Sequence, residues 1–291
     1  MIENQLILKD RVESLLESAL FCIDNDESFL HSTVIADCVK SLIGTDLNNP
    51  CESLLEWLSS DLEKREKKES SKPNQAPEIQ TTSYKELQEG LVRQDRQLVK
   101  NILTRLNFLT DGTQLIEVLI EMSLYQTGRS FVPIWRIYKI LNFINLKDRL
   151  RAYKLMCDFI FEDSFRKNCF NNEKVLNKTI LHISDNYLDI VVFSHILDCQ
   201  SHLFIRQEKL SYALNSMIEY IGMSKNKGIF ETHGSSSKKD RVSVLNKIRN
   251  NRLKLSKKNI LILDSIRMLI KNKPTINDAI VEFMYDNLNS N

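Results

Sequence analysis

Turn-forming residues are scarce in this chain, which has 7 glycines and 5 prolines among its 291 residues. In an average protein these two residues fill about 12% of positions. Sandwiches and barrels of β-strands need frequent tight turns, and tight turns depend on glycine, proline and short polar residues. Apolar residues recur here at helical spacing instead, with charged residues between them. The sequence therefore predicts an all-α fold.

The apolar pattern divides the chain into helices and two polar stretches. Segment 113–126 is almost continuously apolar, so we expect it to be the most buried helix. Gly44 is expected to end the second helix. Residues 63–82 and 224–243 contain few apolar residues and indicate polar linkers. Helices are predicted, among others, over 5–22, 28–42, 83–109, 173–184 and 244–271.

An internal repeat with a period of about 161 residues is suggested by aligning the chain with itself. Residues 20–38 lie over 181–199 with six identities in 19 positions, and the polar linkers coincide. Amphipathic patterning alone is the alternative explanation. We predict two related helical units, 1–165 and a shortened 166–291, from a duplication. Segment 131–163 has no counterpart in the second unit, so we expect it to pack between the halves.

Location and redox state follow from what the sequence lacks. The chain does not begin with a basic and apolar leader, and no 18 apolar residues run together, so we predict no transmembrane helix. Its six cysteines include no Cys-x-x-Cys pair, which removes local support for zinc ribbons and redox motifs. We therefore expect a cytoplasmic protein with reduced thiols.

Four side chains are candidate metal ligands, namely His31, Asp37, Glu121 and His195. Imidazoles and carboxylates from facing helices can hold iron or another transition metal in a bundle core. His195 and His202 are seven residues apart, or roughly 10 Å along a helix, which is too far for joint chelation. The structural alternative for these residues is helix capping, hydrogen bonding and ion pairing in the core. We predict no cofactor, with a metal as the alternative.

Charge is distributed unevenly along the chain. Residues 1–62 contain 3 basic and 12 acidic residues, whereas 225–258 contain 11 basic and 2 acidic residues. The basic segment suits a phosphate backbone, an anionic lipid surface or partner groove, or an intramolecular match to the acidic N-terminal part. The candidate anion-binding residues within 238–258 are Lys238, Lys239, Arg241, Lys247, Arg249, Arg252, Lys254, Lys257 and Lys258.

Three stretches together resemble a known helical family: DNDESFLHSTVIADCVKSLIG, ESLLEWLS and TQLIEVLIEMSLYQTGRSFVPIWRIYKIL. Proteins of this family are questin-oxidase-like, have duplicated halves, and occur alone or beside Rieske-type ferredoxin domains. The resemblance implies a duplicated all-α fold in which a helix carrying a histidine such as His31 is followed by a Leu-Leu-rich helix. A second histidine of the family, near Arg129 or Phe131, is missing here, and the Rieske ligand motif is also missing.

The sequence shows no recognisable constellation of catalytic residues, and the functional prediction rests on this and on the uneven charge. We expect a non-catalytic helical protein that acts as an interaction or scaffold module with a protein partner. A metal- or cofactor-dependent, oxidoreductase-like helical protein is the first alternative. A nucleic-acid-associated factor that uses the basic segment 238–258 is the second. Each of these three functions is compatible with a homo-oligomer.

Overall fold

The computed structural model describes residues 2–67, 81–166, 186–221, 241–250, 253–272 and 278–289. Every named element in these ranges is a helix, which confirms the all-α prediction. Two are short 3₁₀ helices, η1 (Ser28–Leu30) and η2 (Leu146–Asp148). The α-helices are α1 (Ile2–Leu20), α2 (Ser32–Ile43), α3 (Glu52–Glu63), α4 (Tyr84–Val92), α5 (Arg96–Leu109), α6 (Thr113–Leu124), α7 (Phe131–Ile140), α8 (Arg149–Glu162), α9 (Tyr187–Gln200), α10 (Gln207–Tyr220), α11 (Arg241–Arg249), α12 (Lys257–Asn272) and α13 (Asp278–Asn289).

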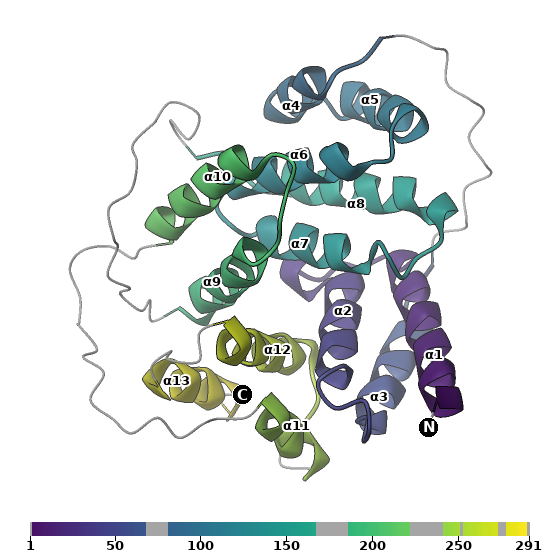
Figure 1. Cartoon of the computed structure of the whole chain (residues 1–291), viewed down its shortest axis with the longest axis vertical. Coiled ribbons are helices and arrows are strands. Elements are labelled where there is room, and N and C mark those ends of the chain that lie inside the picture. The colour runs from purple at the N-terminus through teal and green to yellow at the C-terminus, as the bar shows by residue number, and fades with distance from the viewer. Residues whose placement is uncertain are drawn as a thin grey trace.

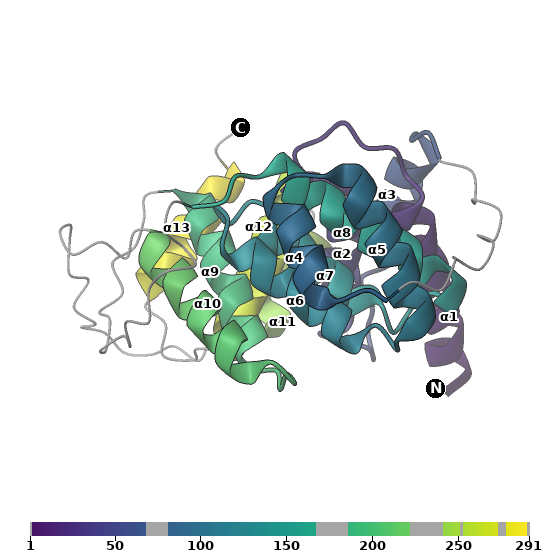
Figure 2. The ribbon, with the colours of Figure 1, turned by 90° about the horizontal axis from the view of Figure 1, so that it is seen from above.

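Helix α7 occupies the middle of the fold, whereas α8, the other helix of segment 131–163, packs against α4, α5, α6 and α7. Helix α7 packs against α2, α6, α8 and α9, and α12 packs against both α2 and α9. Figure 1 shows α4 and α5 at one end and α11 at the other. Figure 2 shows α9, α10 and α13 on one side of α2, α7 and α12, with α1 and α3 on the other. Helices of the two predicted units therefore share one apolar core, and the duplication itself stays a prediction.

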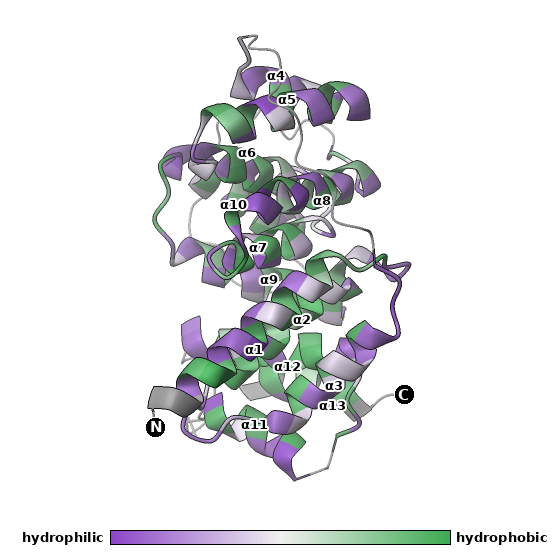
Figure 3. Cartoon of the chain, turned by 90° about the vertical axis from the view of Figure 1, so that its right-hand side faces the viewer, coloured by the Kyte–Doolittle hydropathy of each residue, from purple (hydrophilic) through white to green (hydrophobic). Residues whose placement is uncertain are grey.

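Burial follows the apolar pattern of each helix. All residues from Leu115 to Leu124 of α6 are buried, as predicted for segment 113–126. Helix α12 is equally inaccessible from Asn259 to Leu269. The outer helices α1, α4 and α5 combine hydrophobic and hydrophilic residues (Figure 3), as helices with one face in water do.

Two long predicted helices are each interrupted, which corrects the sequence prediction. The span 83–109 forms α4 and α5 because Gln94 adopts a left-handed φ of 56° and Asp95 then accepts a hydrogen bond from the Leu98 N–H. The span 244–271 lies in α11 and α12, and the Ser256 hydroxyl accepts from the Asn259 N–H at the start of α12. Both breaks are made by polar caps and not by glycine or proline.

Other boundaries differ in detail. The second predicted helix is divided at His31, which lies between η1 and α2. Helix α2 ends at Ile43, directly before Gly44 as predicted, and Gly44 has a φ of −62°. The predicted helix 173–184 and most of both polar linkers lie outside the described residues. Among the residues that the structure describes, no helix is long and apolar enough to cross a membrane.

Candidate functional site

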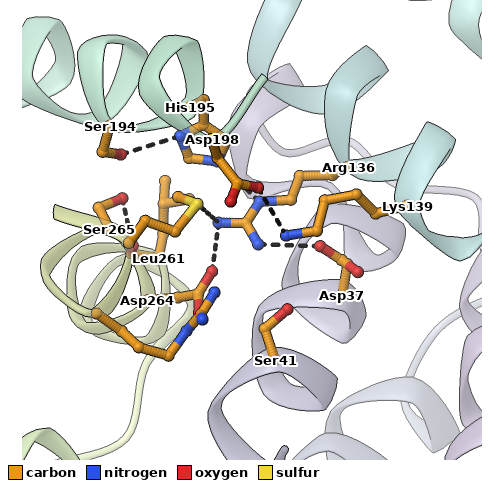
Figure 4. Close-up of polar contacts among 12 residues, drawn as sticks. Asp37, Ser41, Arg136, Lys139, Ser194, His195, Asp198, Leu261, Asp264 and Ser265 are labelled. Atoms are coloured by element: carbon orange, nitrogen blue, oxygen red, sulfur yellow. Dashed lines mark hydrogen bonds and ion pairs between the residues drawn. The ribbon is translucent and has the colours of Figure 1, made fainter. Parts of the chain in front are cut away.

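A buried arginine, Arg136 on α7, joins four helices. Its Nη1 donates to Asp37 Oδ2 on α2 at 2.9 Å, and its Nε donates to His195 Nε2 on α9 at 2.7 Å. Its Nη2 forms an ion pair with Asp264 on α12. All four side chains are out of contact with water. Figure 4 shows the guanidinium surrounded by these partners, so one cation connects segments that are more than 100 residues apart in the chain.

The carboxylates beside Arg136 stay charged because cations surround them. Burial by itself raises the pKa of Asp37, but Lys40 and Arg136 are among the cations that outweigh it and hold this pKa well below its ordinary value. Burial also raises the pKa of Asp264, but Arg136 and Arg267 outweigh it and hold this pKa below its ordinary value. The network is therefore an internal balance of charge rather than a set of groups that titrate near neutral pH.

The hydrogen bonds of His195 fix its tautomer. Its Nε2 accepts from Arg136, so Nδ1 carries the proton and donates to the Val191 carbonyl at 2.7 Å. Burial and the adjacent Arg136 cation hold its pKa well below the ordinary value. His195 is consequently neutral, and both of its nitrogens are occupied by the protein.

A second carboxylate, Asp198 on α9, receives cations from two helices. Its Oδ2 accepts from Lys139 Nζ at 3.1 Å and from Trp135 Nε1 at 3.2 Å, both on α7. Lys271 of α12 lies 3.2 Å from Oδ1. Burial opposes ionisation, but these neighbours hold the pKa of Asp198 below its usual range. Asp37 and Asp198, the aligned positions of the predicted repeat, thus both pair with cations of α7.

The four predicted metal ligands lie in three places. Asp37 and His195 meet only through Arg136. His31 precedes α2, where its Nδ1 accepts from the Thr33 N–H at 3.2 Å. Glu121 pairs with Arg206. Among the described residues, no three histidine, cysteine or acidic side chains form a group that could hold a metal ion. Helix capping describes His31, hydrogen bonding describes His195, and ion pairing describes Asp37 and Glu121.

Several cations of the basic segment contact acidic residues near the N-terminus. Lys257 Nζ lies 3.0 Å from Asp24 and 2.8 Å from Asp26. Arg249 Nη2 lies 2.9 Å from Asp46. These contacts favour the intramolecular explanation of the charge pattern over nucleic-acid binding.

The remaining cations of the segment differ in their surroundings. Lys247 and Lys258 lie over the rings of Tyr285 and Tyr187. Arg241 and Lys254 are both exposed to water. Lys238, Lys239 and Arg252 lie outside the described residues.

The cysteines aligned by the predicted repeat are structural. Cys38 and Cys199 are buried. Burial raises the pKa of the Cys38 thiol to about 12 and that of Cys199 well above its ordinary value. A protonated, inaccessible thiol is a poor nucleophile.

A pocket of about 470 Å³ opens on the other side of α7. This volume falls in the range of small-molecule sites. Tyr138, Leu141 and Asn142 border it from α7 and the turn that follows. The other lining residues are Asp111, Thr113, Ile116, Glu117, Arg149, Leu203, Phe204 and Ile205.

One rim of the pocket is a loop, residues 201–206, which Glu117 of α6 holds in place. The two oxygens of this carboxylate accept from the N–H groups of Ile205 and Arg206, each at 2.8 Å. Glu121 adds the ion pair with the Arg206 side chain. Leu203 is nevertheless 95% exposed and Ile205 is 65% exposed. The fold therefore fixes a loop that presents large apolar side chains to water.

Aromatic rings connect the pocket with the buried network. Trp135 donates to Asp198 and stacks on Tyr138 with ring centroids 4.9 Å apart. His202 lies 4.9 Å from the Trp135 ring, and Phe204 lies 6.5 Å from His202. One helix, α7, thus directs Arg136 and Lys139 to the buried carboxylates and Tyr138 to the pocket.

Sequence reasoning missed both Arg136 and the pocket. Arg136 lies in the apolar run FVPIWRIYKI, where Lys139 is the other charged residue, and Asp264 is the single charged residue of ILILDSI. A lone charge in an apolar helical run is the signal that could have identified a buried pair. The pocket left no such signal, since its lining comes from four separate segments. No protein-family model, curated protein or solved structure matches this chain, so the questin-oxidase-like resemblance stays a prediction.

Proposed function

We propose that this protein acts by binding and not by catalysis, and that it takes an apolar group of its partner into the pocket beside α7. The observation that carries the proposal is the exposure of Leu203 and Ile205 on a loop whose backbone Glu117 holds. Burying one such side chain contributes about 1.5–3 kcal/mol to association. A loop that is already ordered loses little entropy when a partner covers it.

The buried network supports a binding role for the pocket in a second way. Asp37 and His195 have the chemistry of proton-transfer groups, but Arg136 holds both of them. Among the described residues that line the pocket, neither Asp37 nor His195 is present. The network anchors α7 against α2, α9 and α12, and this anchoring keeps Tyr138 and Leu141 in position at the pocket wall.

A neutral apolar fluorophore, N-phenyl-1-naphthylamine, tests this proposal without knowledge of the natural partner. We expect saturable binding of one molecule per chain. Thr113→Trp, which places a large side chain at the lining, should weaken that binding by about tenfold or more. Leu203→Ser should weaken it by about threefold to tenfold, because part of the apolar rim is removed.

A matched control separates the pocket from general surface apolarity. Leu6 on α1 is 55% exposed and does not border the pocket. Leu6→Ser should leave the affinity unchanged. Binding that is absent, or that responds equally to Leu6→Ser and Leu203→Ser, contradicts the proposed function.

A further inference from the structure

The charged side chains that border the pocket differ in whether the protein already uses them. Both Glu117 oxygens accept backbone N–H groups. Asp111 is exposed at the rim, and its Oδ1 accepts from the Thr113 N–H at 2.9 Å. Both carboxylates therefore serve to hold the polypeptide chain.

Arg149 is the exception. It is the first residue of α8 and is partly buried. Its Nε is out of contact with water and has no hydrogen-bond partner. Within the described part of the chain, no acidic side chain forms an ion pair with its guanidinium. The rest of the guanidinium is therefore not used by this part of the protein, and its charge is available to an anion in the pocket.

We propose that the ligand of this pocket carries a carboxylate beside an apolar body, and that Arg149 binds the carboxylate. The inference rests on the proposed function, since it concerns the same pocket. A guanidinium matches a carboxylate with two parallel hydrogen bonds. One guanidinium pairs with one carboxylate, and the lining carboxylates of Asp111 and Glu117 disfavour a second negative charge.

The remainder of the pocket fits the apolar body of such a ligand. Ile116, Leu141 and Phe204 supply aliphatic and aromatic walls. Tyr138 and Asn142 add polar groups on the α7 side. Burial raises the pKa of Tyr138, so its hydroxyl stays protonated and is a hydrogen-bond donor at neutral pH. Few polar groups within apolar walls are typical of sites that orient a small amphipathic molecule.

The chemistry can come from a free small acid or from the C-terminus of a peptide, and titration calorimetry distinguishes the two. The small probes are 4-phenylbutyrate and its neutral counterpart 4-phenylbutanamide. The peptide probes are a hexapeptide that ends in phenylalanine, with a free and with an amidated C-terminus. In each pair that binds, we expect the acid to bind about tenfold or more tightly than the amide. Tighter binding of 4-phenylbutyrate would identify a free small acid as the ligand, and tighter binding of the free-acid peptide would identify a peptide C-terminus.

Variants assign the carboxylate contact to Arg149. Arg149→Gln should remove the advantage of the acid while the amide binds as before, which also reports that the pocket is intact. Arg93→Gln is the control, since Arg93 is exposed at the end of α4 and away from the lining. Equal affinities of acid and amide in the unaltered protein, or an acid preference that survives Arg149→Gln, overturn the inference. If N-phenyl-1-naphthylamine still binds in that case, the proposed function stands; if nothing binds, both fail.

Discussion

The Asp37 carboxylate and the Arg136 guanidinium form an ion pair that water does not reach on either side. The two residues belong to α2 and α7, and the same guanidinium also contacts α9 and α12 through His195 and Asp264. Such a pair need not add net stability over an apolar alternative, but removing one partner leaves the other charge buried and alone. The network therefore specifies which helices lie together around α7.

Replacing Arg136 tests this role. Arg136→Met should lower the free energy of unfolding by about 3–5 kcal/mol, because Asp37 and Asp264 would lose their shared cation. Urea denaturation followed by circular dichroism measures the change. Arg11→Met, which breaks the exposed pair with Glu52, should cost less than about 1 kcal/mol. Similar losses in both variants would show that burial of the Arg136 network has no special weight.

As the pH falls, the protein should begin to lose stability at about pH 6.5, well above the pH at which its carboxylates are protonated. Burial lowers the pKa of His31 to about 4, and its Nδ1 must stay unprotonated to accept the Thr33 N–H. The unfolded chain takes up this proton near pH 6.5, so His31 lowers stability as the pH falls from about 6.5 to 4. The carboxylates with lowered pKa values, such as Asp37, add their loss only below about pH 4.

The variant His31→Asn isolates the histidine contribution, because asparagine caps a helix without titrating in this range. It should reduce the loss of stability between pH 7 and pH 5 by on the order of 2 kcal/mol. Denaturation curves at several pH values measure this difference. An unchanged pH dependence between pH 7 and pH 5 would show that His31 is not held neutral.

Gly112 has a structural requirement that an alanine cannot meet. It has a φ of 82°, and a Cβ at this position would collide with the Tyr153 hydroxyl of α8. Gly112→Ala should destabilise the protein by about 2–4 kcal/mol, from backbone strain and overpacking together. Gly44→Ala is the control, since its φ is −62° and its nearest contact is 3.4 Å. Thermal unfolding that moves equally for both glycines would contradict this explanation.

Glu117 should control the order of the 201–206 loop. In Glu117→Ala, the N–H groups of Ile205 and Arg206 lose their acceptors, so we expect their hydrogen exchange to become about tenfold or more faster. Glu121→Ala removes only the contact with the Arg206 side chain and should change those two amides less. Equal exchange in the unaltered protein and in Glu117→Ala would mean that the loop is held by other contacts.

The helical class and the buried helices could be predicted from the sequence, but the breaks within the predicted helices 83–109 and 244–271 could not. Continuous apolar patterning identified the buried α6 segment. The break between α4 and α5 depends on a left-handed Gln94, a conformation that glutamine rarely adopts and that its sequence does not indicate. Asp95 was the readable signal, because aspartate is a favoured N-cap.

The site was harder to predict because it depends on which helices become neighbours. The sequence singled out Asp37 and His195 as polar residues of interest, and the structure places both on Arg136. Choosing the arginine required knowing that α7 lies between α2 and α9. The Arg149 pocket required still more, since its walls come from α6, α7, α8 and the 201–206 loop.

A crystal structure of the protein with 4-phenylbutyrate would show whether the pocket binds an apolar acid. We expect the phenyl group in the pocket beside α7, against Ile116 and Phe204, with the carboxylate within hydrogen-bond distance of the Arg149 guanidinium. We also expect Leu203 to become less exposed than its present 95%. A probe bound elsewhere on the protein, while this pocket holds only water, would show that the pocket is not the binding site.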